Sequence, residues 1–163
     1  MSDPLDVDVA SEAAAPLSPH DVAFPRLSRA HIDALHPFGE VRNVRRGDVL
    51  FEEGDRGIDF FVVLSGAVRI VEGSSGAARE VAVHEAGHFT GDVDLLTGRA
   101  VLVSGIVIED GAVLALSPAA FRAAVAKVHD LGDLLLRAFL MRRSLLLGAG
   151  LQGLRIVGSR YSP

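Results

Sequence analysis

The chain has 163 residues, 49% of them hydrophobic, with a formal net charge of −5 and no cysteine. This length fits one domain with a tail and can bury a hydrophobic core without disulfides. The lack of cysteine excludes a disulfide framework, a zinc–thiolate site and a redox dithiol, whereas the six histidines leave a histidine metal site open. The acidic balance argues against a nucleic-acid surface, which is normally basic. Because no transmembrane or signal segment is visible, we expect no membrane contact and a cytoplasmic location.

The N-terminal part divides into an acidic leader and a short helix. Residues 1–19 contain four acidic residues and neither Lys nor Arg, so we expect a disordered leader. Phe24 to Phe38 is predicted to be helical, with Ser28 as the N-cap and Pro37 as the stop. The folded domain is then expected to span residues 20–147.

The middle of the chain changes to period-two alternation, which is typical of strands. The expected strands lie around Val49–Phe51 and at Phe60–Leu64, Val68–Val71, Val81–Val83 and Val101–Ile108. Turn signals separate them, at Arg46–Asp48, Glu53–Asp55, Ser65–Gly66, Gly73–Gly76 and Asp110–Gly111. Short strands at this spacing predict a sandwich or barrel, so the expected fold class is mainly β with flanking helices.

Two helices are predicted after the strands. Ser117–Pro118 is a helix start, with Ser at the N-cap and Pro at the first helical position. A second helix is expected over 130–147, and its apolar surface is wide enough for a partner helix in a homodimer. Gly148 to Gly150 are expected to end it, and residues 154–158 to form a strand. We therefore interpret 148–163 as a linker and the start of a following domain in a longer chain.

From Arg45 to Glu72 the chain reads RRGDVLFEEGDRGIDFFVVLSGAVRIVE, which resembles the opening of the cyclic-nucleotide-binding domain family. The matching positions are Gly47, Leu50, Phe51, Gly54, Asp55, Phe61, Leu64, Gly66 and Val68. The resemblance covers about residues 24–147. It implies a jelly-roll β-barrel with C-terminal helices that binds cAMP or cGMP.

A second match, from Gly87 to Ala100, is similar to the family's phosphate-binding cassette. The resemblance implies six ligand-binding residues: Phe89, Thr90, Gly91, Asp92, Arg99 and Ala100. Arg99 would hold the cyclic phosphate through a charge-assisted fork, together with backbone N–H groups near Val93. Asp92 would accept a hydrogen bond from the ribose hydroxyl. The alternatives are a solvated Arg99, a turn glycine at Gly91, and an Asp92 that caps a short helix over residues 93–96.

The run from His84 to His88 matches the HExxH pattern of zinc hydrolases, which works only on a helix. Here it follows a period-two run and contains Gly87, so we expect a strand-to-turn path with two solvent-exposed histidines, no metal site and no catalytic residue. On the last helix, Arg137, Arg142 and Arg143 are expected on a solvated face, although they could reach a ligand.

The sequence therefore predicts a regulatory sensor rather than an enzyme. A nucleotide in the cassette would shift a hinge near Val128–Gly132 and move the last helix. The alternative is a degenerate barrel that serves as a docking or dimerisation domain without a small ligand. Asp92, which stands where the family usually has Glu, and a cassette about two residues short favour this alternative, whereas Arg99 and Gly91 oppose it.

The tail carries a second, shorter resemblance. Too few residues follow Leu147 for the helix-turn-helix of the catabolite activator family, so we expect no DNA binding. Leu151 to Pro163 is similar to the junction in bacterial proteins that fuse this domain to a thioredoxin-reductase-like flavoprotein. That resemblance implies that the parent is an NADPH- and FAD-dependent oxidoreductase, whose cofactors would lie outside this chain. The C-terminal remainder of the longer chain would then be a partner.

Overall fold

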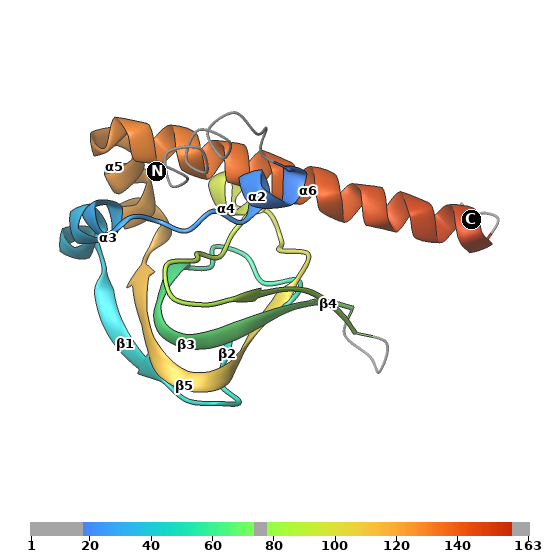
Figure 1. Ribbon diagram of the computed structural model, residues 1–163, viewed down its shortest axis with the longest axis horizontal. Helices are drawn as coiled ribbons and strands as arrows, with labels where there is room; N and C mark the ends of the chain where they lie inside the picture. The colour runs from blue at the N-terminus through green and yellow to red at the C-terminus, as the bar shows by residue number, and fades with distance from the viewer. Residues whose placement is uncertain (1–17, 74–77, 158–163) are drawn as a thin grey trace, which may run out of the picture.

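The computed structural model of the chain describes residues 18–73 and 78–157 (Figure 1). The elements in chain order are α2 (Pro19–Ala23), α3 (Arg29–Leu35), the 3₁₀ turn η1 (His36–Phe38), β1 (Glu40–Val44), β2 (Val49–Phe51), β3 (Phe60–Glu72), β4 (Arg79–His84), α4 (Val93–Thr97), β5 (Ser104–Leu116), α5 (Pro118–Lys127) and α6 (His129–Val157). No helix in this part of the chain is long and apolar enough to cross a membrane.

The strands form one antiparallel sheet in the order β1-β5-β3-β4, and β2 also pairs with β5. Figure 1 shows the sheet curling round, while α6 runs across one side of it together with α2, α4 and α5. An antiparallel sheet with flanking helices is the fold class that the sequence predicts.

The two long strands β3 and β5 correct two turn predictions. Ser65–Gly66 lies inside β3 as a register shift, and Gly111 lies inside β5, opposite Val44. A Cβ on Gly111 would stand 2.1 Å from the Ser65 carbonyl oxygen, so only glycine allows the two backbones to approach this closely. The Ser65 hydroxyl also accepts a hydrogen bond from the Ala112 N–H at 3.1 Å. Glycine marks β-bulges as well as turns, and here the ladder continues through it.

Other strand predictions are confirmed or corrected in detail. The turns at Arg46–Asp48 and Glu53–Asp55 are confirmed, with Gly47 and Gly54 at φ 98° and 97°. The strand expected from residue 101 begins at Ser104, and β1 was missed because only one of its five residues is buried. Most of the turn predicted at 73–76 lies outside the described residues.

The helix predicted over 24–38 is shorter. Helical backbone angles are disfavoured for a residue that precedes a proline, so Phe24, which precedes Pro25, does not start the helix. Helix α3 begins instead after Ser28, whose hydroxyl accepts from the His31 N–H at 3.1 Å. Helix α2 was not predicted. A capping box between Ser18 and Asp21 starts this helix. The last two residues of the predicted leader therefore belong to α2 and its cap, and residues 1–17 lie outside the described part.

The C-terminal helices confirm one boundary and overturn another. Ser117 caps α5 as predicted, and the break between α5 and α6 falls at Val128, inside the predicted hinge. Helix α6 continues to Val157, so the predicted stop at 148–150 and the strand over 154–157 are wrong. A glycine inside a helix costs only about 1 kcal/mol relative to alanine, which leucine-rich neighbours can offset. A short apolar run fits a helix as well as a strand.

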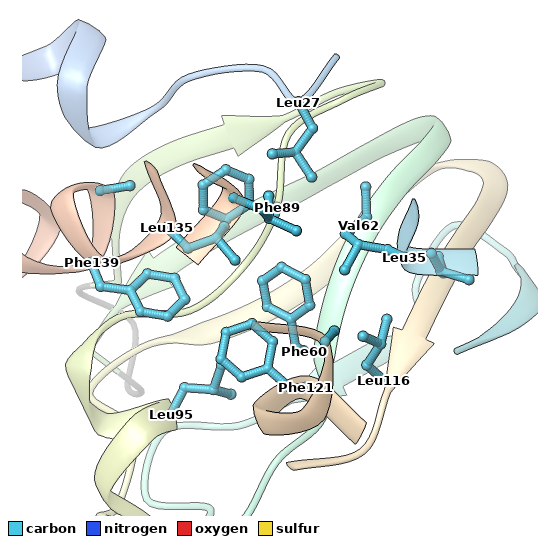
Figure 2. Packing of buried hydrophobic residues seen from close by; sticks show 14 residues of the cluster. Leu27, Leu35, Phe60, Val62, Phe89, Leu95, Leu116, Phe121, Leu135 and Phe139 are labelled. Carbon is cyan, nitrogen blue, oxygen red and sulfur yellow. The ribbon is translucent and has the colours of Figure 1, made fainter. Parts of the chain in front are cut away.

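Both faces of β3 are buried, because successive side chains point to opposite sides of a sheet. Phe60 and Val62 join the larger cluster, which packs under the helices and which we call the helix-side cluster. Phe61 and Val63 join a second cluster with Phe51. Figure 2 shows the rings and leucines of the helix-side cluster converging on Phe60. Its buried members are Leu27, Leu35, Phe60, Val62, Phe89, Leu95, Leu114, Leu116, Phe121, Ala124, Leu131, Leu135, Ala138 and Phe139.

Candidate functional site

A cavity of about 200 Å³ lies beside the predicted cassette, between the sheet, α2 and α6. Most of the side chains that line it are apolar. Its lining residues are His20, Phe24, Phe51, Ile58, Ile70, Arg79, Val81, Ala82, His84, Gly91, Asp92, Leu95, Val101, Leu102, Val103, Arg142, Leu145 and Leu146.

Two of the predicted ligand residues, Phe89 and Thr90, are fully buried. The Phe89 ring belongs to the helix-side cluster. The Thr90 hydroxyl accepts from the Phe61 N–H at 3.1 Å, while the Thr90 N–H donates to the Phe61 carbonyl at 2.9 Å. Both residues therefore fix the cassette to β3, and neither lines the cavity.

Gly91 and Asp92 do line the cavity. Gly91 has φ +115°, and a Cβ there would stand 3.1 Å from the Phe139 ring, so the position requires glycine. Asp92 is the N-cap of α4, because its Oδ1 accepts from the Asp94 N–H at 2.8 Å. Its other oxygen, Oδ2, lies 3.1 Å from Nη2 of Arg143. The predicted capping role is thus confirmed, and Asp92 also stands where a ligand could reach it.

Arg99 and Ala100 lie away from these residues along the cassette. Helix α4 ends at Gly98, which has φ 73°, and Arg99 follows it directly as an exposed residue. Neither Arg99 nor Ala100 lines the cavity. Among residues 18–73 and 78–157, Arg99 takes part in no ion pair.

Arg142 of α6 is a half-buried cation on the lining of the cavity, so the predicted solvated face is wrong for this residue. Its Nε donates to the Ala23 carbonyl at 2.7 Å and its Nη1 to the Gly91 carbonyl at 2.8 Å. Its guanidinium carbon lies 4.5 Å from the centre of the Phe89 ring and 5.1 Å from that of Phe24. Burial lowers the pKa of Arg142 to about 9, and Asp92 opposes this shift. Arg142 still carries its charge at neutral pH.

Arg143 is also half-buried rather than solvated, whereas Arg137 is exposed as predicted. Arg143 pairs with Asp92 and, more closely, with Asp94, whose side chain is only 4% exposed. This contact, which we call the α4–α6 latch, ties the end of the cassette to the last helix. The helical period could have identified Arg142. It lies three residues after Phe139 and seven after Leu135, so the three residues share one face of the helix.

The HExxH run follows the predicted strand-to-turn path, with His84 at the end of β4 and a turn at 86–87. The expected exposure is wrong, because His84 is only 2% exposed and its Nδ1 has no hydrogen-bond partner. Burial, and then Arg142, lowers the pKa of His84 well below its ordinary value. The Nδ1 of His88 accepts from the Glu85 N–H at 2.9 Å. The described residues contain no cluster of three metal-binding side chains.

Solved structures resemble the chain in fold. The N-terminal domain of a transcriptional regulator from Streptomyces coelicolor has 25% identity and a TM-score of 0.56, over 79% of this chain and 91% of that one. The catabolite activator protein of Thermus thermophilus has 24% identity and a TM-score of 0.56, over 85% of this chain. The c-di-GMP-responsive regulator CLP of Xanthomonas campestris has 16% identity and a TM-score of 0.62, over 80% of this chain and 65% of that one.

The chain spans 61% of the length of the Thermus protein. No curated protein sequence matches the chain. The family model described as "Cyclic nucleotide-binding domain" matches residues 41–128, which is more than half of the chain and includes the cassette. The chain therefore belongs to the cyclic nucleotide-binding domain family.

Proposed function

We propose that the chain is a regulatory sensor domain that binds a cyclic nucleotide, cAMP or cGMP, in the cavity beside the cassette. One observation carries this proposal: the cavity has walls from both the cassette and the last helix. Gly91 and Asp92 stand on one side, and Arg142, Leu145 and Leu146 of α6 on the other. A ligand between them acts on the position of α6 directly.

The proposed mechanism uses the α4–α6 latch. Asp92 Oδ2 is the oxygen that a ribose hydroxyl would use, and Arg143 holds it in this structure. Binding of the ribose would compete with Arg143 and loosen α6, which would turn about Val128. Such coupling requires that the nucleotide bind the two positions of α6 with different affinity.

Calorimetric titration of cAMP and cGMP tests this proposal, with Arg99→Ala alongside. The matched control is Arg137→Ala, since both arginines are exposed. We expect micromolar binding of one nucleotide that Arg137→Ala leaves unchanged. Because Arg99 does not line the cavity, a loss of at least about tenfold in Arg99→Ala would mean that the bound nucleotide extends from the cavity to Arg99. No heat with either nucleotide, from a chain shown to be folded, would contradict it.

The second candidate is a docking or dimerisation domain without a small ligand. The cavity of about 200 Å³ favours it, since it is smaller than the roughly 300–1,000 Å³ of common ligand pockets. Three leucines of α6, Leu136, Leu140 and Leu147, are 46%, 54% and 54% exposed and offer a face for a homodimer. Sedimentation of the wild type and of Leu136→Lys/Leu140→Lys tests this face, and a dimer that survives both changes would contradict it.

The parent oxidoreductase and the absence of DNA binding stay predictions. The fusion hypothesis was drawn from Leu151 to Pro163, whose described part is helical rather than a strand. The coding sequence downstream of residue 163 tests this hypothesis, because an FAD- and NADPH-binding reading frame must follow. A mobility-shift assay with random duplex DNA tests the expectation that this chain binds none.

A further inference from the structure

The polar groups of the cavity are incompletely satisfied. Arg142 uses Nε and Nη1 on two carbonyl groups, but its Nη2 is buried without a partner. The Nδ1 of the buried His84 has no partner either. Both side chains line the cavity. Buried polar atoms in proteins nearly always have a partner, so two such atoms on side chains that line one cavity favour a ligand that pairs with these side chains.

The charge of Arg142 is also unmatched. None of the ion pairs among the described residues includes Arg142. The one carboxylate on the lining is Asp92, and its oxygens already contact Arg143 and the Asp94 N–H. A half-buried cation without a counter-ion is less stable than a paired one, and an anion in the cavity would supply the missing charge partner.

The size and the walls of the cavity limit what that anion can be. A cavity of roughly 150 Å³ holds one benzene ring. This cavity of about 200 Å³ thus fits one ring with a small acidic group, and its remaining walls are largely apolar, as at Ile70, Val81 and Val103. A cyclic nucleotide, with a purine, a ribose and a phosphate, needs more space and requires α6 to move outward.

We propose that Arg142 and His84 form the anion subsite of this cavity, and that its ligand is a monoanion whose acidic head pairs with the Arg142 guanidinium and whose ring lies among the apolar walls. The inference uses the same cavity as the proposed function but assigns the anion to an arginine of α6 rather than to Arg99. Two sources share this chemistry, a free aromatic carboxylate and the phosphate of a cyclic nucleotide. In either case the ligand contacts α6, the helix that moves in the proposed function.

The test compares two probes of nearly equal shape, the anion phenylacetate and the neutral phenylacetamide, by titration of a ¹⁵N-labelled chain in NMR. The proteins are the wild type, Arg142→Met, which removes the charge at similar length, and Arg137→Met as the exposed control on the same helix. We expect phenylacetate to shift the Gly91 and Asp92 amides, with binding at least about tenfold tighter than that of phenylacetamide. Arg142→Met should abolish this preference, and Arg137→Met should leave it unchanged.

Equal binding of the acid and the amide, or no shift with phenylacetate, would overturn the inference on the wild type alone, even if Arg142→Met fails to fold. Added cAMP separates the two sources. Displacement of phenylacetate by cAMP identifies the nucleotide phosphate as the anion, whereas phenylacetate binding without any nucleotide binding supports a free carboxylate and refutes the proposed function. Nucleotide binding that needs Arg99 but not Arg142 would refute this inference and keep the proposed function.

Discussion

Helix α6 covers two regions that differ sharply in packing. In the helix-side cluster, Phe139 meets Phe121 and Phe89 with ring centres 6.0 and 6.2 Å apart, and all three rings are buried. Three residues later, Arg142 stands over a cavity with an unpartnered nitrogen, followed by Leu145 and Leu146 on the lining. Figure 2 shows the first region, where Phe139, Leu135 and Leu95 lie close together.

This difference separates the part of α6 that packing fixes from the part that a ligand moves in the proposed function. Protein interiors are normally close-packed, and their buried polar groups are satisfied. In the first turns of α6, Leu131, Leu135 and Phe139 are buried and no buried polar side-chain atom of the described residues lacks a partner, whereas Nη2 of Arg142 has none. We therefore expect stability to depend mainly on the first region and ligand response on the second.

The largest expected effect is on the packed region. Phe139→Ala should lower the free energy of unfolding by about 3–5 kcal/mol, because it leaves a cavity among aromatic side chains. The next residue, Leu140, is 54% exposed, and Leu140→Ala should change stability by no more than about 0.5 kcal/mol. Urea denaturation followed by circular dichroism measures both. Similar losses for the two variants would mean that the two faces of α6 do not differ.

Breaking the α4–α6 latch should cause the next largest loss of stability. Arg143→Met leaves the buried Asp94 carboxylate without its cation, which typically costs about 3–5 kcal/mol for a fully buried pair. The Arg143 side chain is 22% exposed, so we expect a smaller loss of about 2 kcal/mol. Arg137→Met on the exposed face is the control and should be neutral in the same denaturation experiment. If Arg143→Met has the same free energy of unfolding as the wild type, water satisfies the Asp94 carboxylate in place of Arg143.

Gly91 joins the two regions, because its carbonyl binds Arg142 and its Cα faces Phe139. Gly91→Ala should cost about 1–2 kcal/mol through its positive φ and its contact with the ring. Gly54, at φ +97° with nothing within 4 Å of a built Cβ, is the nearer control for the backbone contribution. Thermal unfolding of both variants isolates the contact, and a Gly54→Ala loss as large as that of Gly91→Ala would argue against it.

The smallest expected effect is the pH response of the cavity. The pKa of His84 is lowered in the folded chain, first by burial and then by Arg142, so the unfolded chain binds a proton below about pH 6.5 that the folded chain does not. Stability should therefore fall as the pH drops from 6.5, by at most about 1.4 kcal/mol per pH unit from this one residue.

Melting temperatures measured between pH 7.5 and 5 test this slope, which His84→Phe should flatten in part. The flattening is only partial because the pKa of His88 is also lowered, first by burial and then by Arg26. The control is His36→Phe, at an exposed position, which should keep the wild-type slope. A wild-type slope in His84→Phe would mean that His84 does not titrate differently on folding.

The sequence predicted the barrel because glycines at fixed spacing have few structural explanations. Gly47 and Gly54 occupy turns with positive φ, as expected. Ser65–Gly66 and Gly111 misled the prediction, since close backbone approach inside a sheet also requires glycine. Strand β1 carried no signal, because an edge strand held by main-chain pairing needs little apolar alternation.

The candidate site could be predicted only in part. The cassette motif identified Gly91 and Asp92. A glycine in a turn and an acidic N-cap depend on neighbouring residues, so the local sequence reveals them. Arg142 and Arg143 were missed since a charged residue on a helix is usually solvated, and their partners lie about 50 residues away or farther along the chain. The spacing of Arg142 from Phe139 and Leu135 places it on the buried face of the helix, but the identity of partners this distant leaves no mark in local spacing.

The contact between Arg142 and Ala23 also has a mechanical consequence. Ala23 ends α2, and its carbonyl is held by Nε of Arg142, while Phe24 lies under the guanidinium. Figure 1 shows α2 lying alongside α6, apart from the strands. A force on the N-terminal side of α2 therefore reaches α6 without passing through the sheet. If the proposed function holds, Arg142 would couple the cavity and α2 to the same helix, α6.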